Sequence, residues 1–336
     1  MRYQIFGILV FSVLVAGRAG AVEDQRTVDS AQFVSVSGID QWVTMRGADR
    51  RNTPMLFLHG GPGDALSPFS AKLFADWESY FTLIQWDQPG AGRTFSRSGS
   101  DIASELSIDR IVRDGIDVAE FALDMLGHDK LILVGTSWGS IIASRMVQSR
   151  PDLFEAYVGI SQVVSVRRAV SNAYGEVINH FERSGIETAV SALEALGPPP
   201  WDNVSKLGVL FHHIRIMRGE PAPDLIALAD PEFGPAEFQA WLAADEFSQL
   251  HFFGASLDGE LMQLDLLEEP LDRSVPVYVF QGSDDMVAPL VLAEQFVDAL
   301  DTQEKKLIRF QGAGHELLFE ASDELLGELV EIFDWD

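Results

Sequence analysis

Residues 135–139 read GTSWG, and this stretch decides the fold that the sequence predicts. An apolar strand, Lys130 to Val134, directly precedes it, and a helix, Gly139 to Arg150, follows. The two glycines permit a tight turn where a side chain would clash, so Ser137 is expected in a strained, exposed position. The dipole and free N–H groups of the following helix favour developing negative charge there. A Gly-x-Ser-x-Gly turn in this context is typical of a nucleophile elbow, whereas the motif alone would also fit a flexible loop.

Apolar strands alternate with helical segments along much of the chain, which predicts an α/β fold. Because helices separate the strands, we expect a mostly parallel sheet covered on both faces. An amphipathic helix, Ser322 to Trp335, closes the chain. The strands are expected at Trp42–Arg46, Met55–His59, Phe81–Trp86, Leu131–Gly135, Tyr157–Ile160, Val275–Gln281 and Lys306–Phe310.

The strand pattern is interrupted between about Val166 and Asp272 by helical segments rich in acidic and aromatic residues. A chain of 336 residues fits one large α/β unit with an insertion better than two tandem domains. We therefore expect a core formed by residues 22–165 and 273–336. The intervening residues, 166–272, are expected to form an inserted helical cap.

The first 21 residues have the charged, apolar and small-residue parts of a secretory signal peptide. The apolar run from Ile5 to Gly17 is too short to span a bilayer comfortably. We expect residues 1–21 to be removed and the protein to be exported, either to a periplasm or out of the cell. A retained N-terminal anchor is the alternative, because Arg18 lies unusually close to the expected cleavage site.

The chain is strongly acidic, with 51 Asp and Glu against 24 Lys and Arg and a formal net charge of −27. Such a surface repels phosphate backbones and anionic lipid head groups, so neither a nucleic acid nor, after signal cleavage, a membrane is an expected partner. Cationic or neutral substrates are mildly favoured. The absence of cysteine excludes disulfides, thiolate metal sites and thiol nucleophiles. We expect no metal site, because the adjacent His212 and His213 point to different faces of a helix.

A serine nucleophile needs a histidine base and an acid that orients the base. Two polar segments follow the last two predicted strands, GSDD at 282–285 and GAGH at 312–315. Both lie at carboxyl ends of strands, where open α/β sheets place their sites. His315 is therefore the expected base. Asp285 is the favoured acid, with Asp284 as a loop or capping residue.

A carbonyl under attack becomes an oxyanion, which rigid backbone N–H groups can stabilise. The sequence HGGPG at 59–63 directly follows an apolar strand and supplies such a turn. We expect the N–H groups of Gly61 and Trp138 to be the two donors. The segment lacks the Lys-Ser/Thr ending and the length of a phosphate-binding loop, so nucleotide binding is disfavoured.

Together with DQPGAGRT at 87–94, these motifs resemble the prolyl iminopeptidase branch of the α/β-hydrolases. That branch carries patterns similar to HGGPG, DQRGxGxS, GxSWGS and GxGH, and the resemblance covers most of the chain outside the cap. It implies an α/β-hydrolase core with a helical cap, no cofactor, and release of an N-terminal residue, usually proline, from small peptides. It also implies that Ser137 is the nucleophile, Asp285 the acid and His315 the base, with the amides of Gly61 and Trp138 as the oxyanion hole.

The chain departs from this pattern in two places. Pro89 replaces the usual arginine of DQRG, and the cap has no clear Trp-x-x-Trp-Glu pattern, the nearest segment being AWLAADE at 240–246. In peptidases of this branch, cap carboxylates bind the ammonium group of the substrate, which as a desolvated cation needs an anionic partner. Candidates here are Glu246, Asp245 and Glu176, with Trp241 among the aromatic residues of an apolar pocket roof.

Two other functions stay open at this point. The same core cleaves esters and lactones, so a carboxylesterase or lactonase with a capped apolar pocket is the nearest alternative. A non-catalytic binding protein on a hydrolase scaffold is the alternative of another class. Dehalogenase and epoxide hydrolase functions are disfavoured, because they need an aspartate where this chain has Ser137. The expected partner is a small-molecule or short-peptide substrate, and the sequence does not indicate an oligomeric state.

Overall fold

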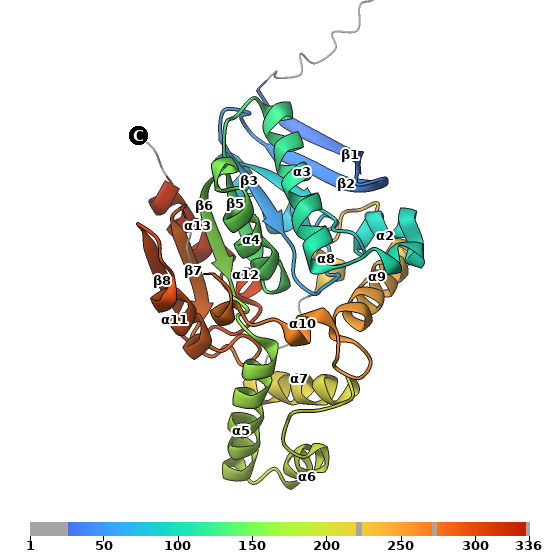
Figure 1. The fold of residues 1–336 in the computed structure, drawn as a ribbon, viewed down its shortest axis with the longest axis vertical. Coiled ribbons are helices and arrows are strands. Elements are labelled where there is room, and N and C mark those ends of the chain that lie inside the picture. The colour runs from blue at the N-terminus through green and yellow to red at the C-terminus, as the bar shows by residue number, and fades with distance from the viewer. Residues whose placement is uncertain (1–25, 220–223, 271–273, 334–336) are drawn as a thin grey trace, which may run out of the picture.

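The computed structural model of the chain describes residues 26–219, 224–270 and 274–333 (Figure 1). The expected signal peptide, residues 1–21, lies outside these residues. In the described part of the chain, no helix combines the length and the apolar character needed to cross a bilayer.

The described residues form one eight-stranded sheet with the strand order β1-β2-β4-β3-β5-β6-β7-β8. β1 pairs with β2, and β2 with β4, in antiparallel fashion, while the remaining neighbours are parallel. The predicted mostly parallel α/β sheet is therefore confirmed. The strands are β1 (Val28–Val36), β2 (Ile39–Gly47), β3 (Thr53–Leu58), β4 (Phe81–Trp86), β5 (Leu131–Thr136), β6 (Phe154–Ile160), β7 (Val277–Gly282) and β8 (Lys305–Phe310).

Helices cover both faces of this sheet, because alternate residues of each central strand point to opposite sides. In β3, Leu56 and Leu58 join the larger hydrophobic core with α3, α4 and α11, whereas Met55 and Phe57 join a second core with α12 and α13. The central strands are buried on both faces and are therefore nearly continuous apolar runs. The helices of this part are α1 (Ser70–Leu73), α2 (Gly92–Ser98), α3 (Ile108–Leu126), α4 (Trp138–Ser149), α11 (Leu290–Ala299), α12 (Leu317–Glu320) and α13 (Ser322–Phe333), with short 3₁₀ turns η1 (Trp77–Ser79), η2 (Gly99–Ser104) and η3 (Pro151–Leu153).

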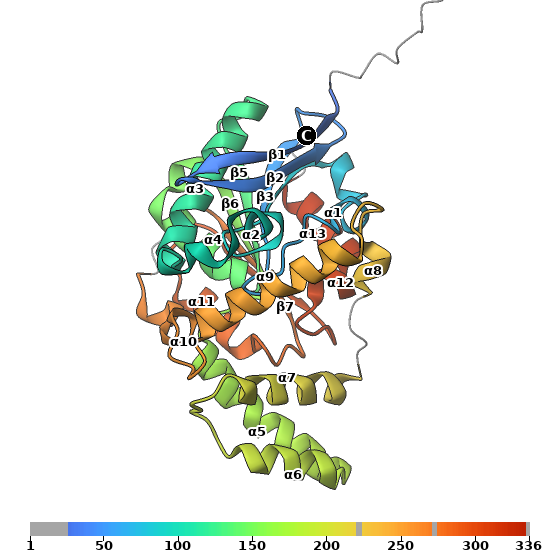
Figure 2. The ribbon, with the colours of Figure 1, turned by 90° about the vertical axis from the view of Figure 1, so that its right-hand side faces the viewer.

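The chain between β6 and β7 contains helices and no strand among its described residues, and we call these the cap helices. Figures 1 and 2 show α5, α6 and α7 at the end of the molecule farthest from β1 and β2. In the same segment, α9 packs against α2. Whether these helices form a separate domain stays a prediction. Their bounds are α5 (Val166–Ser184), α6 (Glu187–Leu196), α7 (Ser205–Arg218), α8 (Leu225–Leu228), α9 (Pro235–Phe253), α10 (Glu260–Gln263) and the turn η4 (Leu266–Glu268).

The parallel strands end level with one another, which gathers the loops that follow them. Leu58 of β3 pairs with Gly135 of β5, and Thr136 pairs with Ile160 of β6. Farther along, Gly282 of β7 pairs with Phe310 of β8. The segments HGGPG, GTSWG, GSDD and GAGH therefore all begin at the same edge of the sheet, as expected for sites of α/β folds.

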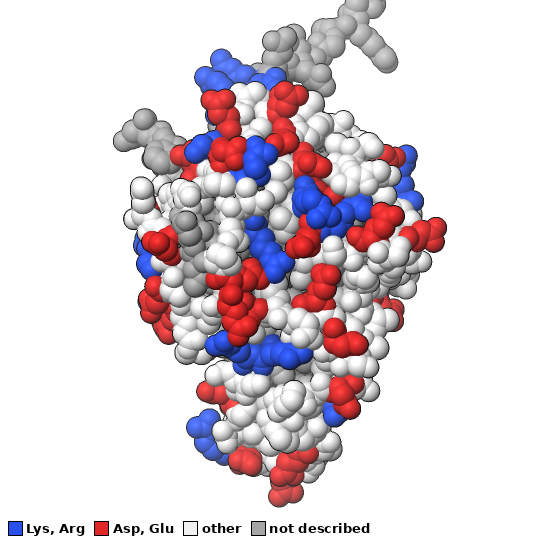
Figure 3. Space-filling model, in the orientation of Figure 1, with Lys and Arg blue, Asp and Glu red and all other residues white. Residues whose placement is uncertain are grey.

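Acidic and basic side chains are interspersed on the face of the molecule drawn in Figure 3. Many arginines on the described surface form ion pairs with nearby carboxylates, such as Arg150 with Glu120 and Asp152. On this face, the excess of acids is therefore not confined to one patch.

Candidate active site

Ser137 occupies the strained turn that the sequence predicts between β5 and α4. Its φ is +50°, in a region that residues other than glycine rarely adopt. A side chain at either flanking glycine would collide with backbone, since a Cβ at Gly135 would lie 2.4 Å from the carbonyl oxygen of Gly139, and one at Gly139 2.2 Å from that of Leu58. The Ser137 N–H donates to the carbonyl of Ile160 at 2.9 Å. Close packing therefore fixes the hydroxyl at the helix N-terminus.

Ser137, His315 and Asp285, which lie far apart in sequence, form one hydrogen-bonded chain. Ser137 Oγ lies 2.9 Å from His315 Nε2. On the other side of the ring, His315 Nδ1 lies 2.9 Å from Asp285 Oδ2. Asp285 accepts a hydrogen bond from the Nδ1–H group of His315. The unprotonated Nε2 of the same ring can then accept the hydroxyl proton of Ser137. The three residues are thus arranged for proton transfer from serine to histidine.

The structure brings Asp285, and not Asp284, to the histidine. The Asp285 side chain is fully buried, whereas that of Asp284 is 59% exposed. Asp285 Oδ1 accepts from the backbone N–H groups of Val287 and Ala288 at 2.9 and 2.8 Å. Gln281 Nε2 donates to its Oδ2 at 2.9 Å. These bonds hold the Asp285 carboxylate in one orientation.

The loop that carries His315 is fixed from both sides. Ser161 Oγ donates to the carbonyl of His315 at 2.7 Å. From the cap, Arg218 of α7 donates to the carbonyls of Asp284 and Gly312 at 3.0 and 3.1 Å. Glu320 accepts from the N–H of Gly314 at 2.8 Å and lies 3.5 Å from Arg218. A cap helix therefore contacts both loops that bear the proposed acid and base.

The surroundings of His315 raise its pKa. Burial alone would lower the pKa, but the charge and hydrogen bond of Asp285, together with the charges of Glu316 and Glu320, outweigh burial and raise it to about 9. Negative charge therefore stabilises the imidazolium form of His315.

A buried hydrogen-bond network joins the HGGPG loop to the start of α4. Trp138 Nε1 donates to Gln88 Oε1 at 2.9 Å, and Gln88 Nε2 donates to the carbonyl of His59 at 3.3 Å. His59 Nδ1 lies 2.9 Å from the carbonyl of Gly60, while its Nε2 accepts from the Gln88 N–H at 3.3 Å. Burial lowers the pKa of His59 to about 4 and so favours the neutral ring that this pattern requires. The network fixes the relative positions of two backbone segments that flank Ser137.

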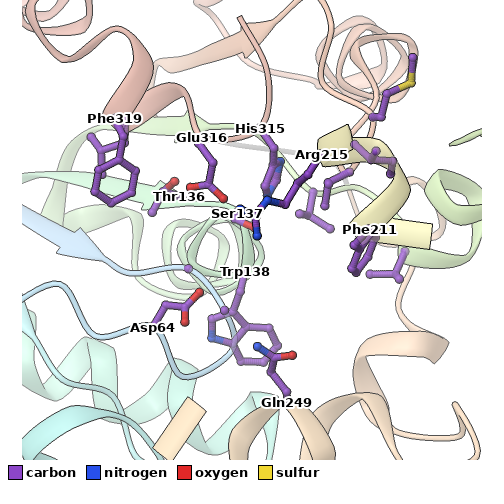
Figure 4. A pocket seen from close by; sticks show the side chains of 18 of the residues that line it. Asp64, Thr136, Ser137, Trp138, Phe211, Arg215, Gln249, His315, Glu316 and Phe319 are labelled. Carbon is purple, nitrogen blue, oxygen red and sulfur yellow. The ribbon is translucent and has the colours of Figure 1, made fainter. Parts of the chain in front are cut away.

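Both residues expected to supply oxyanion donors, Gly61 and Trp138, line one pocket together with Ser137 and His315 (Figure 4). Trp138 is the first residue of α4, so its N–H has no acceptor within the helix. The cavity has a volume of about 440 Å³. Its wall is mostly apolar and is formed jointly by the core and the cap helices, which contribute the apolar residues Val166, Val170, Phe211, Ile214, Leu225, Trp241, Phe253 and Leu261.

The cap residues singled out from the sequence lie in different surroundings. Trp241 lines the pocket and donates its indole N–H to the carbonyl of Ala65 at 2.9 Å. Glu246 and Glu176 are exposed and are not among the described residues that line the pocket. Asp245 also lies outside this lining, but its carboxyl group is hydrogen-bonded to that of Asp64, which is part of it.

Two pocket carboxylates, Asp64 and Glu316, were not predicted from the sequence (Figure 4). Asp64 directly follows HGGPG, and Glu316 directly follows His315, so their positions next to motifs were the available signal. Burial and the neighbouring Asp245 raise the pKa of Asp64 well above its usual range. Burial also raises the pKa of Glu316. A cation close to the hydrogen-bonded Asp64–Asp245 pair would offset these shifts and favour the ionised carboxylates.

In the part of the chain that the structure describes, no three His, Asp or Glu side chains are grouped so that they could hold a metal ion. The polar side chains that line the pocket around Ser137 are instead those of Thr136, His315, Asp64, Glu316, Arg215, Arg218 and Gln249.

Comparison with known sequences agrees with this geometry. The family model of the alpha/beta hydrolase fold matches residues 53–322. A probable aminopeptidase, YbaC, of Bacillus subtilis (strain 168) is 28% identical over 302 residues, covering 88% of this chain and 93% of the relative. A proline iminopeptidase of Neisseria gonorrhoeae is 25% identical over 323 residues, covering 89% of this chain and 96% of the relative.

Solved structures show the same fold at lower identity. A proline iminopeptidase of Mycobacterium smegmatis has a TM-score of 0.64 at 19% identity and covers 90% of this chain and 97% of its own. An epoxide hydrolase mutant of Vigna radiata has a TM-score of 0.57 at 22% identity, and the match covers 91% of this chain and 98% of the epoxide hydrolase chain. The chain belongs to the alpha/beta hydrolase fold family and, within it, resembles the proline iminopeptidases.

Proposed function

We propose that the protein is a serine hydrolase that forms an acyl-enzyme on Ser137. The observation that carries this proposal is the chain of two 2.9 Å contacts from Ser137 through His315 to Asp285, at the wall of an apolar pocket. His315 takes the hydroxyl proton as Ser137 attacks the carbonyl carbon, and the fixed Asp285 carboxylate balances the imidazolium that forms. The matched family makes a hydrolase the expected class of enzyme.

In this mechanism the carbonyl oxygen becomes an oxyanion beside the backbone N–H groups of Gly61 and Trp138. His315 then passes its proton to the leaving group, whose bond to the carbonyl carbon breaks and leaves the acyl group on Ser137. Water, deprotonated by the same histidine, releases the acyl group in a second round. The Gln88 network holds the two N–H groups in place before the charge develops, so little reorganisation is needed during the reaction.

The proposed activity is removal of an N-terminal proline or other small apolar residue from a short peptide. In such a substrate the ammonium nitrogen is only two bonds from the carbonyl carbon that Ser137 attacks. Its binding groups must therefore lie close to Ser137, and the carboxyl groups of Asp64 and Glu316 line the same pocket. The apolar lining suits an uncharged side chain, and relatives named aminopeptidase and proline iminopeptidase support this choice.

Parallel assays test the proposal. Proline-naphthylamide, N-acetylproline-naphthylamide and a short-chain nitrophenyl ester would be offered to the protein and to Ser137→Ala. We expect turnover of the free amine but not of its acetylated form, and loss of nearly all activity in the variant. Cleavage of the ester alone would contradict the peptidase and support a carboxylesterase or lactonase, which the largely apolar pocket wall also suits. Absence of turnover and of fluorophosphonate labelling at Ser137 would support a binding protein.

Export is a further part of the proposal and rests on the signal-like composition of residues 1–21. The chain would be expressed with and without these residues, and its location measured by cell fractionation. Export that depends on residues 1–21, with a mature N-terminus near residue 22, is the expected result. A full-length chain held in the membrane would support the retained anchor instead.

A further inference from the structure

The pocket carries opposite charges around Ser137. In the view of Figure 4, Asp64 and Glu316 lie to one side of Ser137, and Arg215 of α7 lies to the other. All three line the cavity. Arg215 is followed one turn later by Arg218, the other pocket arginine, so α7 supplies two guanidinium groups to the same wall.

The two arginines differ in their bonding. The Arg218 guanidinium is largely buried and is engaged by two backbone carbonyls and by Glu320. For Arg215, by contrast, the described residues supply no hydrogen bond or close ion pair to the guanidinium, although its charge acts on Glu316 of the same pocket and opposes the rise in the pKa of that carboxyl. The chain has about two acids for every base, and the guanidinium groups of the exposed Arg113 and Arg167 likewise have no hydrogen bond or ion pair among the described residues. Of these three arginines, only Arg215 lines the pocket. Many other described arginines are paired with carboxylates, among them Arg46, Arg51, Arg97, Arg110, Arg145, Arg150, Arg168 and Arg309.

We propose that Arg215 forms a carboxylate-binding subsite, so that the preferred substrates are zwitterionic dipeptides with a free C-terminus. This inference rests on the proposed peptidase function. A peptide with its ammonium group on the Asp64 and Glu316 side places its leaving-group residue on the other side of the scissile bond. In a dipeptide the terminal carboxylate is only two bonds beyond the leaving nitrogen, within the same small cavity.

Two physical features support this assignment. Arg215 is itself exposed, and its α7 neighbours Phe211 and Ile214 are apolar lining residues, so these side chains would shield a bound carboxylate from water on the pocket side. A guanidinium can also bind a carboxylate through two parallel hydrogen bonds. The net charge of −27 would by itself repel a substrate carboxylate, so a local cation is needed to accept one.

Binding to the inactive Ser137→Ala protein tests the subsite without cleavage. The dipeptide Pro-Ala and its C-terminal amide, Pro-Ala-NH₂, would be compared by calorimetry in Ser137→Ala, in Ser137→Ala with Arg215→Gln, and in Ser137→Ala with Arg183→Gln. Arg183 is an exposed cap arginine of α5 that does not line the pocket, so its substitution controls for the change in net charge. Thermal unfolding of each variant verifies folding.

We expect Pro-Ala to bind at least about tenfold more tightly than its amide. Arg215→Gln should abolish most of this difference by weakening Pro-Ala alone, and Arg183→Gln should leave the difference intact. Equal binding of the two ligands, a preference that survives Arg215→Gln, or no binding of either would overturn the subsite.

Turnover by the protein with Ser137 intact reports separately on the proposed function. Cleavage of Pro-Ala-NH₂ as fast as Pro-Ala, at equal affinity, would sustain the peptidase and overturn the subsite. An Arg215-dependent preference in binding without any cleavage of Pro-Ala would refute the peptidase and leave the carboxylate contact standing.

Discussion

Asp285 and Asp284 are adjacent and have the same side chain, yet only Asp285 is buried and bonded to His315. Asp285→Asn replaces an acceptor with an amide that cannot hold the imidazole in the required tautomer or balance its charge. We expect kcat to fall by about 10³–10⁴-fold. Asp284→Asn, the matched control, changes an exposed carboxylate and should alter kcat by less than about threefold. Initial rates of the two variants test the assignment of Asp285 as the acid, and equal losses of kcat would contradict it.

The raised pKa of His315 predicts an alkaline activity profile. A general base must be neutral, so activity is present above the pKa of His315 and declines as the pH falls below it. We expect kcat/KM for a nitrophenyl ester to rise through a pKa well above 6.5, toward about 9. An ester without an amino group leaves only the enzyme to titrate, and Ser137→Ala supplies the background rate.

Glu316→Gln tests the cause of that shift. Glu316 is one of the negative charges that stabilise the imidazolium of His315. Its removal should move the acid limb of the pH profile of kcat/KM for the ester to lower pH. The same change should weaken binding of a free N-terminal amine if Glu316 contacts it. An unchanged apparent pKa in this profile would mean that Glu316 does not affect the protonation of His315.

At the scale of elements, the active-site end depends on a polar network between the HGGPG loop and α4. In Gln88→Leu, the buried indole N–H of Trp138 loses its acceptor and the carbonyl of His59 loses a donor. The free energy of unfolding should fall by about 1–3 kcal/mol. Because the network positions the proposed oxyanion donors, kcat should fall more than KM changes.

Urea unfolding and steady-state kinetics measure both effects of Gln88→Leu. Gln303 is an exposed glutamine outside the pocket lining and offers the same substitution as a control. Gln303→Leu should change stability by no more than about 0.5 kcal/mol. A Gln88→Leu protein with unaltered kcat would show that the network supports the fold alone.

The central strands could be predicted from the sequence because nearly all of their residues are buried. β3 and β5 are buried on both faces, which requires apolar runs, and the segments that follow parallel strands must meet at one edge. The sequence pattern does not predict β1, because this edge strand has mostly exposed and half-buried residues and so lacks a continuous apolar run. The prediction that His315 and Asp285 lie near Ser137 required only the positions of the strand ends and the order of the motifs along the chain.

The pocket wall could not be predicted in the same way, because it depends on how the cap helices are placed. The sequence makes Glu246 and Glu176 candidates for binding an amine, yet both are exposed, since α9 and α5 turn other residues toward the cavity. The Asp64–Asp245 pair joins positions far apart in sequence. It arises because Gly63 lets the loop approach α9, where a Cβ would lie 2.7 Å from the Cα of Asp245. Such contacts follow from tertiary packing and not from local pattern.

For the molecule as a whole, the net charge of −27 acts on any charged substrate. A long-range field of this sign attracts a cationic N-terminal amine and has no effect on a neutral ester. Raising the ionic strength from about 0.02 to 0.5 M shortens the screening length severalfold. We therefore expect kcat/KM for proline-naphthylamide to fall severalfold with salt, mainly through KM, while that for the nitrophenyl ester stays nearly constant. A zwitterionic dipeptide should fall between the two, because its carboxylate offsets the attraction at long range. Equal salt dependence for all three substrates would show that the surface charge does not contribute to substrate capture.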